Sequence, residues 1–183
     1  TTKEPSYGNP LPRIAECTEG LINSVGLQNP GVDRVIAEEL PRLKPLFHKK
    51  AIANISGFSV EDYVSAAEKL DREEQIGILE INVSCPNVSA GGMSVGTDPM
   101  ALSRLMERLR PMTDKPMIVK LTPNVTDITV PARAAVEHGA DALSMINTLK
   151  GMRINIRTGK PIIANVTGGV SGPAVLPVGL AAV

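Results

Sequence analysis

Four short apolar runs recur along the chain, and they constrain its fold more than any other feature. They read AIANI, IGILEINVS, PMIVKLT and DALSMINT, at residues 51–55, 76–84, 116–122 and 141–148. Short continuous runs of this kind are typical of strands that are buried on both faces of a parallel sheet. The sequence therefore predicts four parallel strands.

Segments with the helical spacing of apolar side chains lie between and around these runs. Ser59 and Asp98 are predicted helix N-caps, because each precedes such a segment and has a side-chain oxygen that can accept a backbone N–H. Gly139 is predicted to end a later helix, since glycine readily adopts the left-handed conformation found after many helices. Helices are therefore expected over residues 30–43, 59–70, 98–109 and 126–138.

A polar residue stands near the C-terminal end of each predicted strand: Asn54, Asn82, Lys120 and Asn147. These residues are separated by 28, 38 and 27 positions, close to the ~30 residues of a βα unit. The repeat predicts one α/β domain, residues 1–183, with a parallel sheet. A TIM (β/α)8 barrel normally takes ~250 residues, so this chain would form an incomplete one. An open doubly wound sheet fits the same pattern.

The four polar residues are expected at one rim of the sheet, where ligands bind in parallel α/β folds. Because side chains alternate along a strand, Asn54 shares a face with Ile52, and Lys120 shares one with Ile118. A single asparagine at such a place can equally satisfy a turn. Lys120 is more informative, since its apolar neighbours desolvate its charge unless an anion or an electron-rich ring meets it, or unless it extends into solvent.

Cys85 lies between a predicted strand and a glycine-rich loop, and its position allows two interpretations. A free cysteine often packs as a small apolar group. The loop that contains Gly91, Gly92 and Gly96 could instead close over a ligand. A thiol can then act as a nucleophile or general base where its surroundings favour the thiolate. We favour the chemical role for Cys85 and a structural role for Cys17.

The segment after the fourth run alternates in polarity around Thr158 and Gly159, which predicts a hairpin or an extended excursion. The following TGGVSGPA, residues 167–174, is interpreted as a turn. A further helix is expected to begin near Pro173.

Charge and composition argue against several classes of partner. The chain has 19 basic and 19 acidic residues, so nothing in its charge attracts nucleic acid or an anionic membrane. No apolar run reaches the ~18 residues of a membrane span, and the first residues lack the apolar core of a signal peptide, so a cytoplasmic location is expected. Two cysteines and no ligand-like spacing predict neither a disulfide framework nor a metal site.

Six segments resemble the catalytic subunit of class 1B dihydroorotate dehydrogenase, in order along the chain. They are NSVGLQNPG (23–31), NVSCPNV (82–88), GTDP (96–99), VKLTPNVTDI (119–128), INTLKGM (146–152) and KPIIANVTGGVSGPA (160–174). The resemblance implies an α/β fold, a TIM barrel of the FMN-linked type that is incomplete here, with about strands 2/3 to 6 plus a hairpin excursion. It also implies oxidation of (S)-dihydroorotate to orotate in UMP biosynthesis.

The resemblance assigns roles to individual residues. Cys85 matches the general base that removes a proton from C5 of dihydroorotate. The substrate-binding positions match Asn23, Ser24, Val25, Gly26, Leu27, Asn82, Asn87, Asn147 and Thr148. The FMN-binding positions match Thr1, Asn54, Asn82, Lys120, Ile146 and Gly172.

The resemblance further implies a homodimer of catalytic subunits and an electron-transfer subunit that carries FAD and a 2Fe–2S cluster and reduces NAD. It implies that the first strand, most of the second and the last two strands lie outside these 183 residues, together with the glycine-rich turns that hold the FMN phosphate. Two alternatives stay open. One is the related flavin domain of dihydropyrimidine dehydrogenase, which acts on uracil or thymine, and the other is a non-catalytic barrel fragment.

Overall fold

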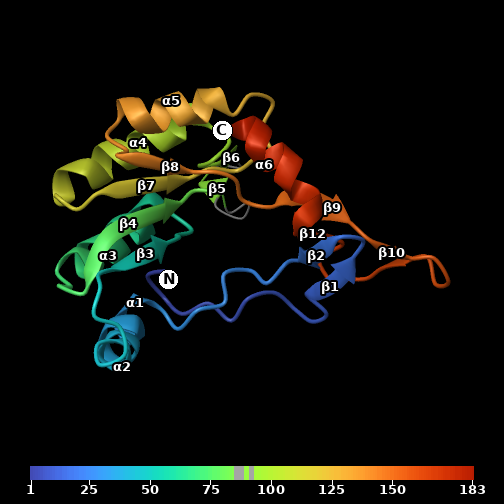
Figure 1. Ribbon diagram of the computed structural model, residues 1–183, viewed down its shortest axis with the longest axis horizontal. Coiled ribbons are helices and arrows are strands. Elements are labelled where there is room, and N and C mark those ends of the chain that lie inside the picture. Colours follow the sequence, from blue (N-terminus) through green and yellow to red (C-terminus); the bar gives the residue numbers. More distant parts are fainter. Residues whose placement is uncertain (85–88, 91–92) are drawn as a thin grey trace.

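A four-stranded parallel sheet organises the chain, as the apolar runs predict (Figure 1). The computed structural model describes residues 1–84, 89–90 and 93–183. The sheet has the order β3 (Ala51–Ile55), β4 (Ile76–Asn82), β7 (Met117–Lys120) and β8 (Ala142–Ser144). Each pair of neighbouring strands is parallel. All four predicted strands are confirmed, although the last is shorter than its apolar run.

Three helices cover one face of this sheet: α3 (Val60–Asp71), α4 (Pro99–Leu109) and α5 (Thr129–Glu137). Figure 1 shows them on the outer side of the strands. The predicted N-caps are confirmed, since the Ser59 and Asp98 side chains accept hydrogen bonds from Asp62 N and Met100 N at 3.2 and 3.0 Å.

Helix α5 begins at Thr129, three residues later than predicted. The Asp127 carboxylate accepts hydrogen bonds from the Thr129 hydroxyl and backbone N–H at 2.7 and 2.9 Å. These bonds lower the pKa of Asp127, the side-chain bond most of all. The helix stops at Gly139 as predicted, with φ of 96° at that glycine.

The two faces of the parallel sheet differ in what they contact. Every second side chain of β4 and β7 points toward the helices and is buried there. These side chains, Leu79, Ile81, Met117 and Val119, belong to the same apolar cluster as Leu102, Leu105 and Met106 of α4. Burying each such side chain is worth about 1.5–3 kcal/mol. On the opposite face Ile52 is 57% exposed, although it belongs to the same strand as the fully buried Ile55.

The covered and uncovered faces decide between the two architectures that the sequence left open. A doubly wound sheet has helices on both faces, whereas a TIM barrel has them only on the outside. Here α3, α4 and α5 lie on one face, and the strands do not close on themselves within the described residues. The fold is therefore an incomplete TIM barrel.

A second sheet, which is antiparallel, joins the N-terminal and C-terminal parts of the chain. Its order is β1 (Ile14–Cys17), β2 (Gly20–Asn23), β12 (Thr167–Ser171) and β9 (Leu149–Met152). The prediction of a turn over TGGVSGPA is wrong, because Thr167–Ser171 is a strand hydrogen-bonded on both sides. Its glycines allow close approach: a Cβ at Gly168 would clash with Asn23 O at 2.5 Å.

Smaller elements complete the chain. The predicted hairpin around Gly159 is confirmed by β10 (Ile154–Asn155) and β11 (Lys160–Pro161), which project from the body of the molecule (Figure 1). The helix expected near Pro173 consists of η3 (Pro173–Val175) and α6 (Leu176–Ala182). The helix expected over residues 30–43 consists of three successive pieces: α1 (Val32–Arg34), a π-helical turn η1 (Val35–Glu39) and α2 (Leu40–Leu43). Two short strands, β5 (Ser89–Ala90) and β6 (Met93–Ser94), pair with each other in antiparallel orientation.

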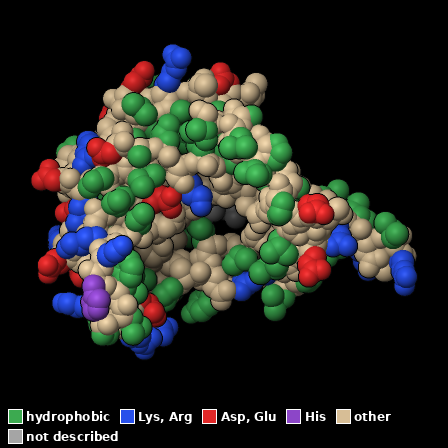
Figure 2. Space-filling view, in the orientation of Figure 1, with side chains coloured by type: hydrophobic (Ala, Val, Ile, Leu, Met, Phe, Trp, Pro, Cys, Tyr) green, Lys and Arg blue, Asp and Glu red, His purple; other side chains and the backbone are tan. Residues whose placement is uncertain are grey.

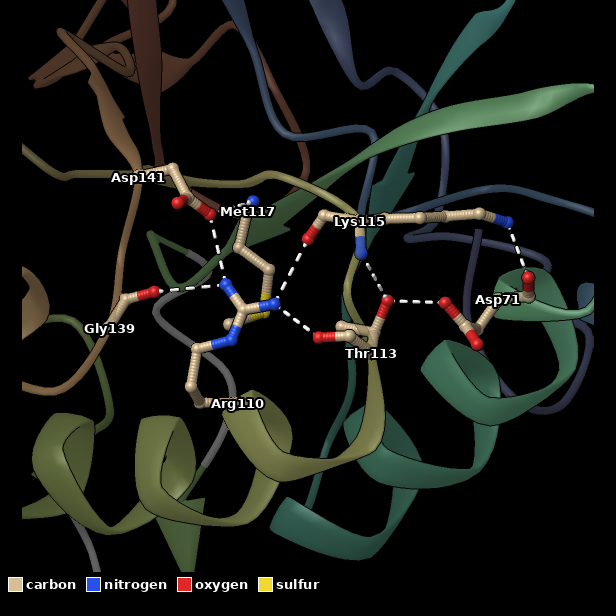
Figure 3. Close-up of polar contacts among 7 residues, drawn as sticks. All are labelled: Asp71, Arg110, Thr113, Lys115, Met117, Gly139 and Asp141. Carbon is tan, nitrogen blue, oxygen red and sulfur yellow. Dashed lines mark hydrogen bonds and ion pairs between the residues drawn. The ribbon is translucent and has the colours of Figure 1, made fainter.

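A polar network holds the amino ends of β7 and β8, away from the carboxyl rim (Figure 3). Arg110, which follows α4 in η2 (Arg110–Met112), donates from Nη1 to Asp141 Oδ2 at 2.9 Å and to Gly139 O at 3.3 Å. Its Nη2 donates to Lys115 O at 3.1 Å and also to Thr113 O. Asp141 Oδ2 accepts a further bond from Met117 N at 2.7 Å. One guanidinium therefore ties a helix end to the starts of two strands.

The same contacts make this network sensitive to pH. The hydrogen bond from the Met117 N–H, aided by the charge of Arg110, lowers the pKa of Asp141 from its ordinary value, although desolvation opposes the shift. A carboxyl group whose pKa is lower in the folded state stabilises the fold at pH above its unfolded value and loses that contribution as the pH falls through the folded pKa. The stabilisation from Asp141 is thus present at neutral pH and is lost as the pH falls through the lowered pKa of this carboxyl group.

We expect Arg110→Ala to lower the free energy of unfolding by about 2 kcal/mol at pH 7, because it leaves Asp141 and several carbonyl groups without their donor. Urea denaturation of the complete protein measures this change. Arg108→Ala is the matched control, because Arg108 forms an exposed ion pair with Glu61 at 3.6 Å. Loss of this ion pair should lower the free energy of unfolding by less than about 0.5 kcal/mol. Equal effects of the two substitutions would contradict the role given to Arg110.

Candidate functional site

The carboxyl rim of the parallel sheet brings three of the four predicted polar residues onto one face. Asn82 lies directly opposite Lys120 in the β4–β7 register, and Asn54 lies opposite Glu80 in the β3–β4 register. Because Glu80 and Asn82 are two residues apart on one strand, all of these side chains leave the sheet on the same side. That side is the one that the helices do not cover.

Asn54 and Lys120 differ in how their polar groups are satisfied. Asn54 Nδ2 donates to Glu80 Oε2, and Asn54 O accepts a hydrogen bond from Thr1 N at 2.5 Å. The Lys120 ammonium has no hydrogen-bond or ion-pair partner among the residues that the structure describes. A half-buried cation of this kind is suited to a ligand that carries negative charge or an acceptor edge.

Asn147, the fourth predicted rim residue, lies beyond the end of β8 but is connected to Asn82. Its backbone N–H donates to Leu121 O at 3.0 Å, which continues the hydrogen bonding of β7 past the strand. Its side-chain Nδ2 donates to the Ser84 hydroxyl, and that hydroxyl donates to Asn82 Oδ1. The amides of Asn82 and Asn147 are thus joined through one serine.

An open pocket of about 280 Å³ adjoins this hydrogen-bonded chain. Four of the predicted site residues line it, namely Ile146, Asn147, Thr148 and Gly172. Residues of β12 and α6, including Ser171 and Gly179, form its other walls. Figure 2 shows the molecular surface hollowed between the parallel and antiparallel sheets, with basic and acidic side chains at the edge. The pocket therefore collects positions from three separate segments.

The predicted segment Asn23–Leu27 reaches this region through the antiparallel sheet. Asn23 pairs with Gly169 across β2 and β12, and its Nδ2 lies 3.5 Å from Gly169 O. Thr148 packs against the other side of Gly169, so close that a Cβ at that glycine would overlap its hydroxyl. Asn23 and Thr148 are thus held near each other by a residue that has no side chain.

The rest of the segment has an irregular backbone that its neighbours hold in place. Gly26 and Leu27 both have positive φ, 79° and 57°. Asn9 N and Nδ2 donate to Val25 O and Ser24 O, each at 2.9 Å. Ser24 Oγ is buried and has no hydrogen-bond partner within the described residues.

The structure does not bring every predicted residue to the pocket. Thr1 and Asn54 lie at the β3 edge of the parallel sheet, three strands from β8 and apart from the pocket lining. Cys85 and Asn87 lie outside the described residues. The residues joined by direct contact or a common lining are Asn23, Asn82, Ile146, Asn147, Thr148 and Gly172.

Several residues that support the site were missed by the sequence analysis. Ser84 joins two predicted asparagines, and Tyr63, buried on α3, donates its hydroxyl to Asn82 O at 2.8 Å. Asn124 Nδ2 donates to Thr148 O at 3.0 Å, and its Oδ1 accepts from Lys150 N at 2.8 Å. Asn29 Oδ1 accepts from the backbone of Gly31 and from Thr2. The only sequence signal for Ser84, Asn124 and Asn29 is that each lies inside one of the six resembling segments.

The polar groups of the rim are amides, hydroxyls, one ammonium and the Glu80 carboxylate that Asn54 contacts, so they can bind a planar ligand with carbonyl and N–H edges. In the described part of the chain, no three His, Cys, Asp or Glu side chains are grouped so that they could hold a metal ion. Among the same residues, no helix is both long and apolar enough to cross a membrane.

Comparisons with known proteins identify relatives of this chain. A family model described as "Dihydroorotate dehydrogenase" matches residues 1–183. The "Dihydroorotate dehydrogenase B (NAD(+)), catalytic subunit" of Geobacillus kaustophilus is 52% identical over 180 residues, 98% of this chain and 57% of the relative. Proteins of the same name from Bacillus cytotoxicus and Fusobacterium nucleatum are each 49% identical, over 98% of this chain and 58% and 59% of their own length. The chain thus spans less than two thirds of these relatives.

We expect Gly169→Ala to lower the free energy of unfolding by about 1–3 kcal/mol, because the added methyl must displace Thr148 or β9. Gly179→Ala is the matched control, since its Cβ would meet Ile146 Cγ1 at an ordinary 3.8 Å. Chemical denaturation of both variants in the complete protein measures the difference. Wild-type stability of Gly169→Ala would show that Thr148 does not depend on this close approach.

Proposed function

Because this chain belongs to the dihydroorotate dehydrogenase family, we propose that the complete protein oxidises (S)-dihydroorotate to orotate in pyrimidine synthesis. We assign residues 1–183 to one partial FMN-binding barrel domain. The observation that carries the proposal is the hydrogen-bonded chain from Asn82 through Ser84 to Asn147 beside the pocket. It places amide groups from two strand ends where a planar ring with carbonyl edges could lie.

The substrate would be held by amides and backbone groups on both sides of the pocket. Asn82 and Asn147 offer side-chain N–H groups from the parallel sheet, and the segment Asn23–Leu27 would offer backbone groups from the antiparallel sheet. Thr148 connects the two, since it packs on Gly169 next to Asn23. Orotate and dihydroorotate have carboxylate and carbonyl oxygens that can accept these donors.

FMN fits the residues at the rim. Lys120 offers an ammonium without a partner among the described residues. Gly172, with φ of 120°, lines the pocket, and the absence of a Cβ there lets the backbone of Glu19 and Gly20 approach closely. Thr1, Asn54, Asn82 and Ile146 would contribute the remaining contacts. When bound, FMN supplies the hydride acceptor for C6 of the substrate. A lysine near the ring favours negative charge on its reduced form.

Cys85 is proposed as the general base, on the resemblance of NVSCPNV to the family motif. In the sequence it follows Asn82, the last residue of β4, by three positions. As a thiolate it would take the proton from C5 of dihydroorotate. Thiolates form more readily than alkoxides near neutral pH, so the residue type suits this role.

The relatives are named catalytic subunits of an NAD-dependent enzyme, and we extend this to the present protein. We propose that it forms a homodimer and transfers electrons to a second subunit that carries FAD and a 2Fe–2S cluster. NAD would be the final acceptor. The protein would act in the cytoplasm.

Turnover by the complete protein with its electron-transfer subunit tests the activity. We expect reduction of NAD with dihydroorotate and much slower reduction with dihydrouracil, because the predicted donors match the carboxylate that dihydrouracil lacks. Preference for dihydrouracil would favour the dihydropyrimidine dehydrogenase-like alternative. A colourless protein that is inert with both substrates would favour a non-catalytic role.

We expect Cys85→Ser to slow flavin reduction by dihydroorotate about 100-fold or more at pH 7, with partial recovery at high pH, because a hydroxyl is a far weaker acid than a thiol. Stopped-flow absorbance of the flavin measures this rate. Cys17→Ser is the matched control, since Cys17 is half-buried in β1 and should leave the rate unchanged. Equal rates for Cys85→Ser and the wild type would exclude the assigned role.

A further inference from the structure

The hydroxyl of Ser84 occupies the space between two amides of the candidate site. Ser84 lies two residues beyond the end of β4 and is half-buried. Its Oγ donates to Asn82 Oδ1 and accepts from Asn147 Nδ2. A hydroxyl can do both at once, because it carries one donor proton and two acceptor lone pairs.

The orientation of each amide is set independently by a backbone donor. Ser84 N donates to Asn82 Oδ1 at 3.3 Å, and Thr148 N donates to Asn147 Oδ1 at 2.7 Å. A backbone N–H can only donate, so both oxygens must face their backbone partners. An acceptor oxygen of one amide is then left facing a donor nitrogen of the other across a gap. A side chain in that gap must accept from one and donate to the other.

The direction of these bonds determines what each amide has left for a ligand. Asn82 Oδ1 is occupied twice by Ser84, whereas Asn82 Nδ2 has no hydrogen-bond partner within the described residues. Asn147 uses one hydrogen of Nδ2 on Ser84 and keeps the other. The two amides therefore retain N–H donors, which match carbonyl and carboxylate oxygens rather than N–H groups.

We propose that Ser84 is a positioning residue that turns the N–H groups of Asn82 and Asn147 toward the acceptor edge of the substrate. The inference rests on the proposed function and deepens it. Without the hydroxyl, Asn147 Nδ2 loses its acceptor, and of the two hydrogen bonds that orient this amide only the one from Thr148 N remains. Substrate binding must then also offset the loss of side-chain conformational entropy when the amide becomes ordered, which weakens the affinity.

The hydroxyl is not needed to hold the backbone of this strand end. Strand β4 is paired with β7 up to Asn82 and Lys120. Tyr63 OH holds Asn82 O at 2.8 Å from the helix side. Removal of the Ser84 hydroxyl should therefore alter amide orientation with little effect on the fold.

The test uses the complete protein and orotate as the probe, with binding measured by isothermal titration calorimetry and turnover measured with dihydroorotate. We expect Ser84→Ala to weaken orotate binding about tenfold and to raise KM by a similar factor, with kcat changed less than about threefold. Ser84→Thr keeps a hydroxyl and should restore binding to within about threefold of wild type. Ser103→Ala, the same change on α4 outside the site, should have no effect.

A double-mutant cycle with Asn147→Ala separates positioning from a general structural role. If Ser84 acts through the amide, its removal should matter less once Asn147 is already alanine, so the combined loss of affinity should be smaller than the product of the two single losses. Fully multiplicative losses, wild-type affinity of Ser84→Ala, or a collapse of its melting temperature would each overturn the proposal. A wild-type protein that does not bind orotate would instead overturn the proposed function, and this inference with it.

Discussion

The parallel pairing of β4 with β7 is the constraint on which the candidate site depends. It sets Asn82 opposite Lys120 on the uncovered face and keeps Ile81 and Val119 against the helices. Because side chains alternate along a strand, a slip of one residue would bury Lys120 and expose Val119. The Arg110 network holds the starts of β7 and β8. It therefore stabilises the alignment of these strands at the amino end of the sheet, opposite the rim that carries the site residues.

The two sheets contribute different parts of the site. The parallel sheet supplies the ammonium of Lys120 and the amide of Asn82 at its carboxyl rim. The antiparallel sheet brings Asn23 next to Thr148 through the bare backbone of Gly169. Asn23 and Thr148, which are more than a hundred positions apart in the sequence, can thus both contact β12 at Gly169 because this residue has no side chain.

The parallel sheet and its helices could be predicted from the sequence because their signals are local: continuous apolar runs, capping residues such as Ser59 and Asp98, and the stop at Gly139. The antiparallel sheet could not. Strand Thr167–Ser171 contains glycines and polar residues that also suit a turn, and only its pairing with β2 and β9 makes it a strand. Ser84 was missed for the same reason, since its role depends on Asn147, 63 positions away.

The polar groups of the rim divide into those satisfied within the protein and those left for a ligand. Asn54 is bonded to Glu80, and the oxygens of Asn82 and Asn147 are bonded to backbone N–H groups. The Lys120 ammonium and Asn82 Nδ2 are donors without a partner among the described residues. Unsatisfied donors on a sheltered face carry a desolvation cost that a ligand rich in acceptors removes. These two donors favour a ligand with carbonyl or carboxylate oxygens over a purely apolar one.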